Sequence, residues 1–288
     1  MASTIILKRR ITSISSTRQI TKAMELVSAS KLRRAQDYAQ RSRDYRDLAY
    51  DLLRKLNAMN EVERMPLFHK RPVKNRLYVV ITSNTGLAGA YNSNVLKLLT
   101  EGLRGDQAQK AKSHVITIGS KGAQFVRRLQ AVDLLAAYPP LGDRPTANDV
   151  RPILNTVVEQ YTSEKVDEVR VLFTDFKSNL VQEAQSLQLL PAPLLDVDTA
   201  TIAISNFEPD VETVVQEVTT RLIEAQIWQA ALESLASEHA MRMIATKNAT
   251  DNANDLIGDY TLELNTARQA AITQELAEIS GGVEALSD

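Results

Sequence analysis

The chain has 288 residues, of which 44% are hydrophobic and only 5% aromatic, a composition more typical of helical rods than of one large globular core. It contains no cysteine, which excludes disulfide bonds and thiolate metal sites, and its three histidines, His69, His114 and His239, are too scattered for a structural zinc site. The net charge is only -1, and the longest apolar run, residues 77–81, is far shorter than the roughly 20 residues that span a bilayer. We therefore expect no metal, no cofactor and no direct membrane insertion.

The residues that interrupt helices are concentrated in the middle of the chain. All nine prolines lie between Pro66 and Pro209, so both ends are free to form long helices. The apolar pattern over residues 5–56 predicts one helix of about 55 residues. At the other end of the chain, we expect Gly281 and Gly282 to mark the end of a second long helix.

The middle of the chain alternates strand-like and helical segments. Apolar, β-branched runs at 77–82, 114–118 and 169–173 predict strands, and a further edge strand is expected at 187–190. Helical patterns lie between these runs, at 92–103, 123–129 and 149–161. This order is typical of a small parallel sheet covered by helices, so we predict a Rossmann-like α/β domain over residues 74–200.

The C-terminal region carries a long seam of mostly apolar residues. From Val211 to Glu278, small and apolar residues recur at alternating spacings of four and three, which is typical of a coiled coil. We predict that residues 1–60 and 207–288 form an antiparallel coiled-coil shaft. His239 falls on the seam, where a polar residue more often fixes the register of the two helices than binds a ligand.

The two predicted helices carry opposite charge. Residues 1–55 have 13 Lys and Arg against 5 Asp and Glu, a net charge of +8, whereas residues 207–288 have 4 against 15, a net charge of -11. Opposite charges favour pairing of the two helices with each other, although each exposed ion pair is weak. The basic residues alternate with an apolar stripe and lack stacking aromatic residues, so we expect no nucleic-acid partner.

The predicted helices differ in length. With Asn57 placed opposite Glu208 in an antiparallel pair, the first residues of the N-terminal helix lie opposite about Leu262 of the second helix. About twenty residues of the second helix then project alone. Such a segment is marginal in water by itself, so we expect a partner to cover it. The same register brings Ile5 close to Tyr260, and cysteines at those two positions are expected to cross-link.

Two glycine-bearing turns lie where nucleotide phosphates often bind, between a strand and a helix, at residues 83–89 and 119–122. Neither is a phosphate-binding fingerprint: the first has only G-x-x-G, and in the second Lys121 precedes Gly122, whereas a P-loop needs G-K-[ST]. A nucleotide-dependent enzyme built on the α/β domain is one alternative, and a general coiled-coil adaptor is another.

Three stretches of the chain resemble motifs of a known protein family. They are RQITKAMELVSASKL from Arg18, SEHAMRM from Ser237 with KNATDNA from Lys247, and RQAAITQELAEISGGVEA from Arg268. They closely resemble the gamma subunit of proton-translocating ATP synthases, and the resemblance covers the whole chain. The lack of cysteine and of an extra segment in the α/β domain sets the chain apart from the photosynthetic branch of that family and favours a bacterial origin.

The resemblance implies a non-catalytic rotor shaft. In this family the coiled coil threads a ring of three alpha and three beta subunits, its tip turns in an apolar bearing, and the α/β domain joins the epsilon subunit and the membrane c-ring. Ion-driven rotation of the c-ring then forces the beta subunits through their nucleotide-binding states for ATP synthesis, or the reverse during hydrolysis. The expected location is the cytoplasmic face of the bacterial cell membrane, as a peripheral component.

The resemblance also implies roles for polar and basic residues of both helices. Four residues match contacts with the catch loops of the beta subunits: Arg268, Gln269, Thr273 and Glu275. Five more match positions that face the acidic lever of the beta subunit or that affect coupling between shaft and ring: Lys22, Met24, Lys31, Arg242 and Thr250. The plain alternative for each of them is a solvated helix face.

Overall fold

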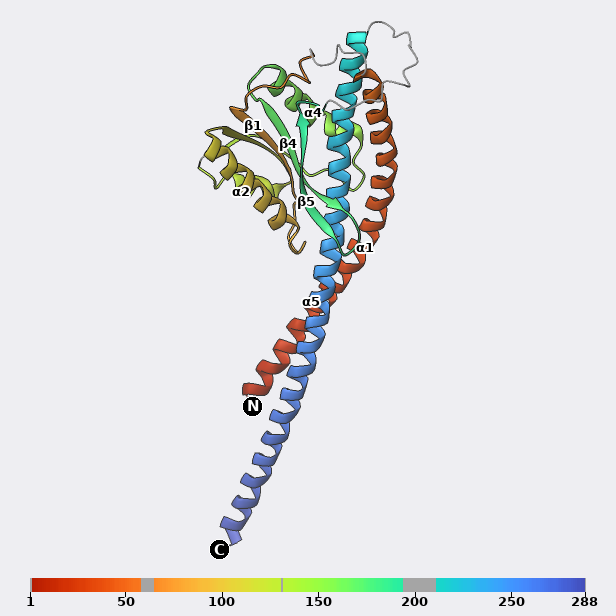
Figure 1. Ribbon diagram of the computed structural model, residues 1–288. Helices are drawn as coiled ribbons and strands as arrows, with labels where there is room; N and C mark the ends of the chain where they lie inside the picture. The colour runs from red at the N-terminus through yellow and green to blue at the C-terminus, as the bar shows by residue number, and fades with distance from the viewer. Residues whose placement is uncertain (1, 58–64, 131, 194–210, 288) are drawn as a thin grey trace. The chain divides into compact units, whose positions relative to one another are not determined.

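The structure, a computed structural model, describes residues 2–57, 65–130, 132–193 and 211–287 (Figure 1). The chain divides into two compact units, one of Ala29–Arg242 and the other of Met1–Ser28 together with Met243–Asp288. Two long helices, α1 (Ala2–Asn57) and α5 (Val211–Ser287), contribute residues to both units. The predicted first helix of about 55 residues is confirmed, since α1 has 56. None of the described helices is long and apolar enough to cross a membrane.

The unit of Ala29–Arg242 contains one mixed, five-stranded sheet with the order β3-β2-β1-β4-β5. Its strands are β1 (Asn75–Ile81), β2 (Lys112–Ile118), β3 (Asp133–Tyr138), β4 (Glu168–Phe176) and β5 (Gln182–Leu190). The first four are parallel to one another, which confirms the predicted parallel sheet for them, but β5 is antiparallel to β4, so the sheet is mixed at this edge. Only a short turn joins β4 to β5, and a short turn can only reverse the chain.

Helices cover both faces of this sheet. They are α2 (Tyr91–Gln109), α3 (Ser120–Val126), α4 (Ala147–Thr162) and the first part of α5. Alternate residues of a strand point to opposite faces, so Tyr78 and Val80 of β1 pack towards α2 and α3, whereas Leu77 and Val79 pack towards α4 and α5. The result is a three-layer α/β/α arrangement.

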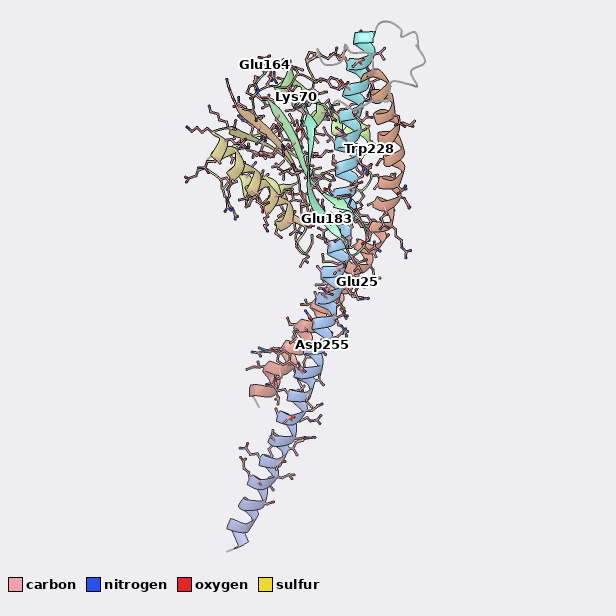
Figure 2. All side chains as sticks on the ribbon, in the orientation of Figure 1. Glu25, Lys70, Glu164, Glu183, Trp228 and Asp255 are labelled. Atoms are coloured by element: carbon pink, nitrogen blue, oxygen red, sulfur yellow. The ribbon has the colours of Figure 1, made fainter. Side chains whose placement is uncertain are left out.

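The first part of α5 is an integral part of this core. Its apolar side chains belong to the same buried cluster as those of the strands and of α4; they include Leu222, Ile223, Ile227, Ala230 and Ala231. Trp228, the only tryptophan of the chain, lies on the same helix (Figure 2). Its ring nitrogen donates to the carbonyl oxygen of Pro145 at 2.9 Å, which ties α5 to the loop before α4.

In the second unit, α1 and α5 lie side by side and antiparallel. Three contacts between side chains establish the direction and the register: Thr21 with Thr250 at 2.8 Å, Arg18 with Asn254 at 3.2 Å, and Arg10 with Tyr260 at 3.4 Å. From residue 251 to 280, the positions of α5 that are not exposed are the predicted seam positions: Ala253, Ile257, Tyr260, Leu264, Ala267 and Ala271. The seam is therefore confirmed from Ala253 to Ala271, whereas its last two predicted positions, Gln274 and Glu278, are exposed.

The register differs from the predicted one by several residues. Tyr260 contacts Arg10, and the side chain of Ile5 is exposed. The prediction counted from the helix ends, with Asn57 opposite Glu208, and Glu208 lies outside the described residues. With the observed register, pairing reaches to about residue 269, which is nearly two helical turns further than predicted.

The last part of α5 extends beyond the start of α1, over residues 270–287. Helix α5 continues to Ser287, so the prediction that Gly281 and Gly282 would end the helix was wrong. A glycine costs a helix only about 1 kcal/mol relative to alanine, and this cost does not by itself stop a helix. The projecting segment is therefore one uninterrupted helix.

The observed register can be tested by cross-linking. A chain with Thr21→Cys and Thr250→Cys should form an intramolecular disulfide on mild oxidation, because the two hydroxyl groups are 2.8 Å apart and the native chain has no cysteine. Peptide mapping by mass spectrometry would detect the bond. The pair Ile5→Cys and Tyr260→Cys should stay reduced under the same conditions, and the opposite outcome would restore the register predicted from the helix ends.

Candidate functional site

Hydrogen bonds join the two glycine-bearing turns to each other, so they leave no phosphate site open. The backbone N–H of Ser120 donates to Asn84 Oδ1 at 2.9 Å, that of Lys121 to the carbonyl oxygen of Ser83 at 3.1 Å, and that of Gly122 to Thr82 Oγ1 at 2.9 Å. The N-terminal amides of α3 are the groups that would bind a phosphate. Because they already have partners within the chain, this arrangement disfavours the alternative of a nucleotide-dependent enzyme.

Gly119 is required by the close contact between these turns. Its φ of +93° is a conformation that L side chains rarely adopt, and a Cβ atom there would lie 2.1 Å from the carbonyl oxygen of Thr82. The carbonyl belongs to the backbone at the end of β1, so it cannot rotate away as a side chain would.

Gly119→Ala should therefore lower the free energy of unfolding by about 3 kcal/mol, through backbone strain and the clash together. Urea titration followed by circular dichroism would measure the change. Gly105→Ala is the matched control, because nothing lies within 4 Å of a Cβ atom added there and Gly105 is in the interior of α2, so it should be neutral or slightly stabilising. Equal effects of the two substitutions would contradict the argument.

Arg242 lies against the first glycine-bearing turn. Its guanidinium donates to Thr85 Oγ1 at 3.1 Å and to the carbonyl oxygen of Gly86 at 3.4 Å, and it also forms an ion pair with Glu238 at 2.6 Å. Only 7% of Arg242 is exposed, so the plain alternative of a solvated helix face is wrong for this residue. Burial raises the pKa of Glu238, and the positive charge of Arg242 opposes that rise. The carboxyl edge of the sheet, where open α/β sheets bind their ligands, is thus occupied by α5.

Thr250 is also buried, in the unit of the paired helix ends. Its hydroxyl lies 2.8 Å from that of Thr21, and each hydroxyl also lies within hydrogen-bonding distance of a carbonyl oxygen of its own helix. Each hydroxyl has one proton, so when the two bond to each other only one of the two carbonyls can receive the other proton. The pair fixes the register of the two helices and is largely shielded from solvent.

The basic residues predicted on α1 have partners within the chain. Lys22 is exposed and pairs with Glu25 at 3.1 Å, and Met24, two residues further on, is half-buried. Lys31 donates to Asp143 at 2.8 Å, and this hydrogen bond lowers the pKa of the Asp143 carboxyl. Asp143 belongs to the loop before α4, a partner that sequence spacing does not indicate.

The four predicted catch-loop residues are all exposed on the end of α5: Arg268, Gln269, Thr273 and Glu275. The Thr273 hydroxyl donates to the backbone carbonyl oxygen of Gln269 at 3.0 Å, so Gln269 and Thr273 lie on one face of the helix. Large apolar side chains are exposed around them, namely Ile272, Leu276 and Ile279. The segment thus presents polar and apolar side chains together to its surroundings.

His239 is buried in the unit of Ala29–Arg242, with 5% of the residue exposed, and neither ring nitrogen has a hydrogen-bond partner there. Burial, and secondly the positive charges of Arg242 and Lys31, lower its pKa to about 4. The imidazole is therefore neutral in the folded chain at neutral pH. No ligand is needed to explain this position on the seam.

The pKa of His239 predicts a pH dependence of stability. A lowered pKa in the folded state means that the contribution of the neutral imidazole is complete above pH 6.5, the ordinary value, and is lost as the pH falls towards 4. Between pH 7 and pH 4 the wild type should lose up to about 3 kcal/mol more stability than His239→Leu, which cannot titrate. Urea titrations at several pH values would show it, with His69→Gln, an exposed histidine, as control. Parallel pH profiles for wild type and His239→Leu would contradict the assignment.

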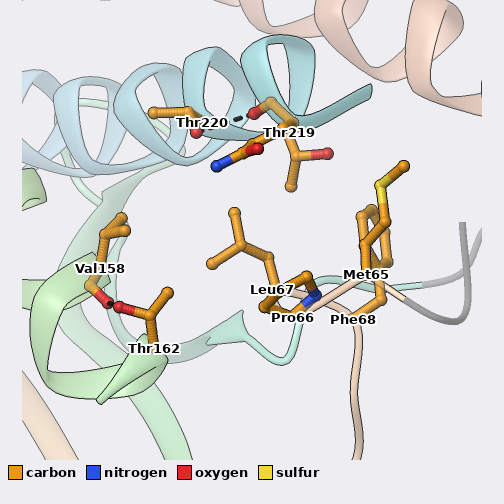
Figure 3. Close-up of a pocket in the computed structure, with 9 residues that line it drawn as sticks. Met65, Pro66, Leu67, Phe68, Val158, Thr162, Thr219 and Thr220 are labelled. Atoms are coloured by element: carbon orange, nitrogen blue, oxygen red, sulfur yellow. Dashed lines mark hydrogen bonds between the residues drawn. The ribbon is translucent and has the colours of Figure 1, made fainter. Parts of the chain in front are cut away.

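A small apolar pocket lies at the start of α5 (Figure 3). Leu67 and Phe68 line one side, and α4 and α5 contribute Thr162, Thr219 and Thr220. The hydroxyls of these three threonines donate to carbonyl oxygens of their own helices at 2.8, 2.7 and 2.8 Å, so they offer little to a polar ligand. The cavity measures about 70 Å³.

In the part of the chain that the structure describes, no group of three or more His, Cys, Asp or Glu could hold a metal ion.

Comparison with known proteins identifies the family. The family model described as ATP synthase matches residues 3–286. The ATP synthase gamma chain of Stenotrophomonas maltophilia (strain R551-3) is 39% identical over 288 residues, which cover 99% of this chain and 100% of that protein. The chain belongs to the ATP synthase gamma-chain family. Another member, from Legionella pneumophila (strain Corby), is 36% identical over 289 residues, with 99% and 100% coverage.

Solved structures of ATP synthases contain chains with the same fold. A chain of the Euglena gracilis mitochondrial ATP synthase, in the structure of OSCP, F1 and c-ring in rotational state 3, has a TM-score of 0.71 at 18% identity, covering 99% of this chain and 95% of that one. A chain of the Tetrahymena thermophila central stalk and c-ring has a TM-score of 0.64 at 23% identity, covering 80% and 99%. At these identities the likeness extends to the fold alone.

Proposed function

We propose that the chain is the central rotor shaft of an ATP synthase. It couples ion-driven rotation of a membrane c-ring to the conformational cycle of the catalytic beta subunits, for ATP synthesis or, in reverse, during hydrolysis. The observation that carries this proposal is the match to gamma chains over the whole length. The unpaired end of α5 supports it, because the segment with the most specific signature is also the one that the rest of its unit leaves exposed.

The proposed role needs no chemistry from the chain itself. A shaft acts by favouring one conformation of its partner over another, and it can do so only as far as its contacts differ between those conformations. We therefore propose a non-catalytic subunit without a cofactor. Its partners are three alpha and three beta subunits, the epsilon subunit and the c-ring, and its place is the cytoplasmic face of the bacterial membrane, without insertion into it. The shaft comprises residues 1–60 and 207–288, and the α/β domain comprises residues 74–200.

The candidate residues fall into three groups that differ in burial. Those that we assign to the catch loops of the beta subunits are exposed and free to meet another subunit: Arg268, Gln269, Thr273 and Glu275. We assign Lys22, Met24 and Lys31 to the side that faces the acidic lever of the beta subunit. Arg242 and Thr250 are buried, so any effect of these two on coupling runs through the shape of the shaft rather than through direct contact with a partner.

Reconstitution tests this function directly. Mixed with purified alpha and beta subunits of the same organism, the chain should elute on gel filtration in a large complex with ATPase activity. A chain that stays alone, and that instead binds nucleotide with micromolar affinity, would support the enzyme alternative and refute the shaft.

A substitution in the projecting segment separates the shaft from a general coiled-coil adaptor. Leu276→Asp should weaken assembly by about tenfold or more, because it would bring an uncompensated carboxylate into apolar surroundings. An adaptor would tolerate it, since Leu276 is exposed in the isolated chain. Leu262→Asp, an equally exposed apolar position on the part of α5 that is paired with α1, is the matched control.

A further inference from the structure

Two serines of α5 bind the backbone of the central strand β4 within the unit of Ala29–Arg242. The backbone N–H of Thr174 donates to Ser234 Oγ at 3.0 Å, and the hydroxyl of Ser237 donates to the carbonyl oxygen of Thr174 at 3.2 Å. The two serines are three residues apart and therefore lie on the same face of the helix. Both are fully buried, as is Thr174.

These bonds lie at the place where β4 loses its parallel neighbour. The pairing of β1 with β4 runs to Val80 opposite Leu172, and β1 ends at Ile81. Thr174 lies beyond that end, so β1 cannot satisfy its backbone groups. Buried backbone groups without a partner are costly, and here Ser234 supplies the acceptor and Ser237 the donor that β1 cannot provide.

Arg242 makes a second connection, to the turn that follows β1. Its bonds to Thr85 and Gly86 reach the backbone of that turn, and its ion pair with Glu238 holds the guanidinium in place. Ser234, Ser237 and Arg242 thus connect α5 to the carboxyl ends of both central strands, β1 and β4.

The apolar contacts of α5 differ from these bonds in one important respect. Hydrophobic packing is not directional, so it resists separation of helix and sheet more than it resists sliding or turning of one on the other. Hydrogen bonds depend on both distance and angle, and they weaken steeply when either changes. The polar contacts are therefore the ones suited to hold α5 against rotation.

We propose that Ser234 and Ser237, together with Arg242, whose link to coupling the resemblance already implies, are positioning residues that transmit torque between the α/β domain and the shaft helix. This inference rests on the proposed function of the chain. The residues touch no nucleotide; they fix how the sheet turns with α5, and α5 continues without interruption to the segment at its end.

Hydrogen exchange on the full chain tests whether Ser234 holds the backbone of β4. In Ser234→Ala the amide of Thr174 loses its acceptor, so it should exchange about fivefold faster, as expected for the loss of one hydrogen bond. Ser163→Ala is the matched control, because that hydroxyl donates only to carbonyl oxygens of its own helix end. Unchanged exchange at Thr174 in Ser234→Ala would overturn the inference.

Measurements on the complete enzyme test whether these residues transmit torque. The complex is rebuilt in lipid vesicles with the double variant Ser234→Ala and Ser237→Ala, and separately with Arg242→Lys, and both ATP hydrolysis and proton pumping are measured. We expect hydrolysis to persist, while the ratio of pumping to hydrolysis falls roughly twofold or more, the range found for residues that carry coupling. A merely structural role would lower both rates together through loss of folded protein and leave their ratio unchanged.

The outcomes separate this inference from the proposed function. A wild-type chain that fails to assemble or to support hydrolysis refutes the shaft itself. A wild-type complex that pumps, with variants that keep its pumping ratio, refutes only the torque role of these residues. If the double variant fails to assemble, Ser234→Ala and Ser237→Ala are measured singly by the same ratio.

Discussion

The packing of α5 on the sheet is the interaction on which the rest of the structure depends. A helix of 77 residues has no reason to be stable by itself in water, because helix stability in proteins comes mainly from the packing of an apolar face. The first part of α5 obtains that packing from β1, β4 and α4, and the residues from Met243 to about residue 269 obtain it from α1. One helix therefore completes the core of the α/β layers and also supplies half of an antiparallel pair.

The buried positions of the paired helices hold small and polar residues beside leucines such as Leu7 and Leu32. Thr21 meets Thr250, and Ser42 donates to Gln229 in the other unit, so hydroxyls and amides occupy seam positions that a tight zipper would fill with leucine. Such residues contribute less apolar area, but each hydrogen bond is satisfied in one register only, and a buried polar residue is the best-attested device for fixing register. The helices are thus held in one alignment at a modest cost in stability.

The sequence predicted the parts of this fold that repeat and missed the parts that depend on distant partners. The seam of α5 was readable because its spacing persists through Ala253, Ile257 and Tyr260. Strand β3 was not, since its short run of leucine and alanine has no strong β preference and its strand conformation comes from pairing with β2. The ion pair of Glu238 with Arg242 follows from helical spacing, whereas the contacts of Arg242 with Thr85 join residues 157 positions apart, which no local pattern reveals.

The continuation of α5 through Gly281 and Gly282 also bears on the solvation of its end. The last four carbonyl groups of any helix lack partners within it, and they are costly to place in apolar surroundings. If the helix stopped at the glycines, those carbonyls would belong to the same turn as Ile279. Because it runs on to Ser287, they lie beyond the glycines, and every carbonyl beside the exposed apolar side chains already accepts a hydrogen bond from its own helix. The exposed apolar side chains near the end of α5 can therefore be buried by a partner without leaving the carbonyl groups beside them unpaired.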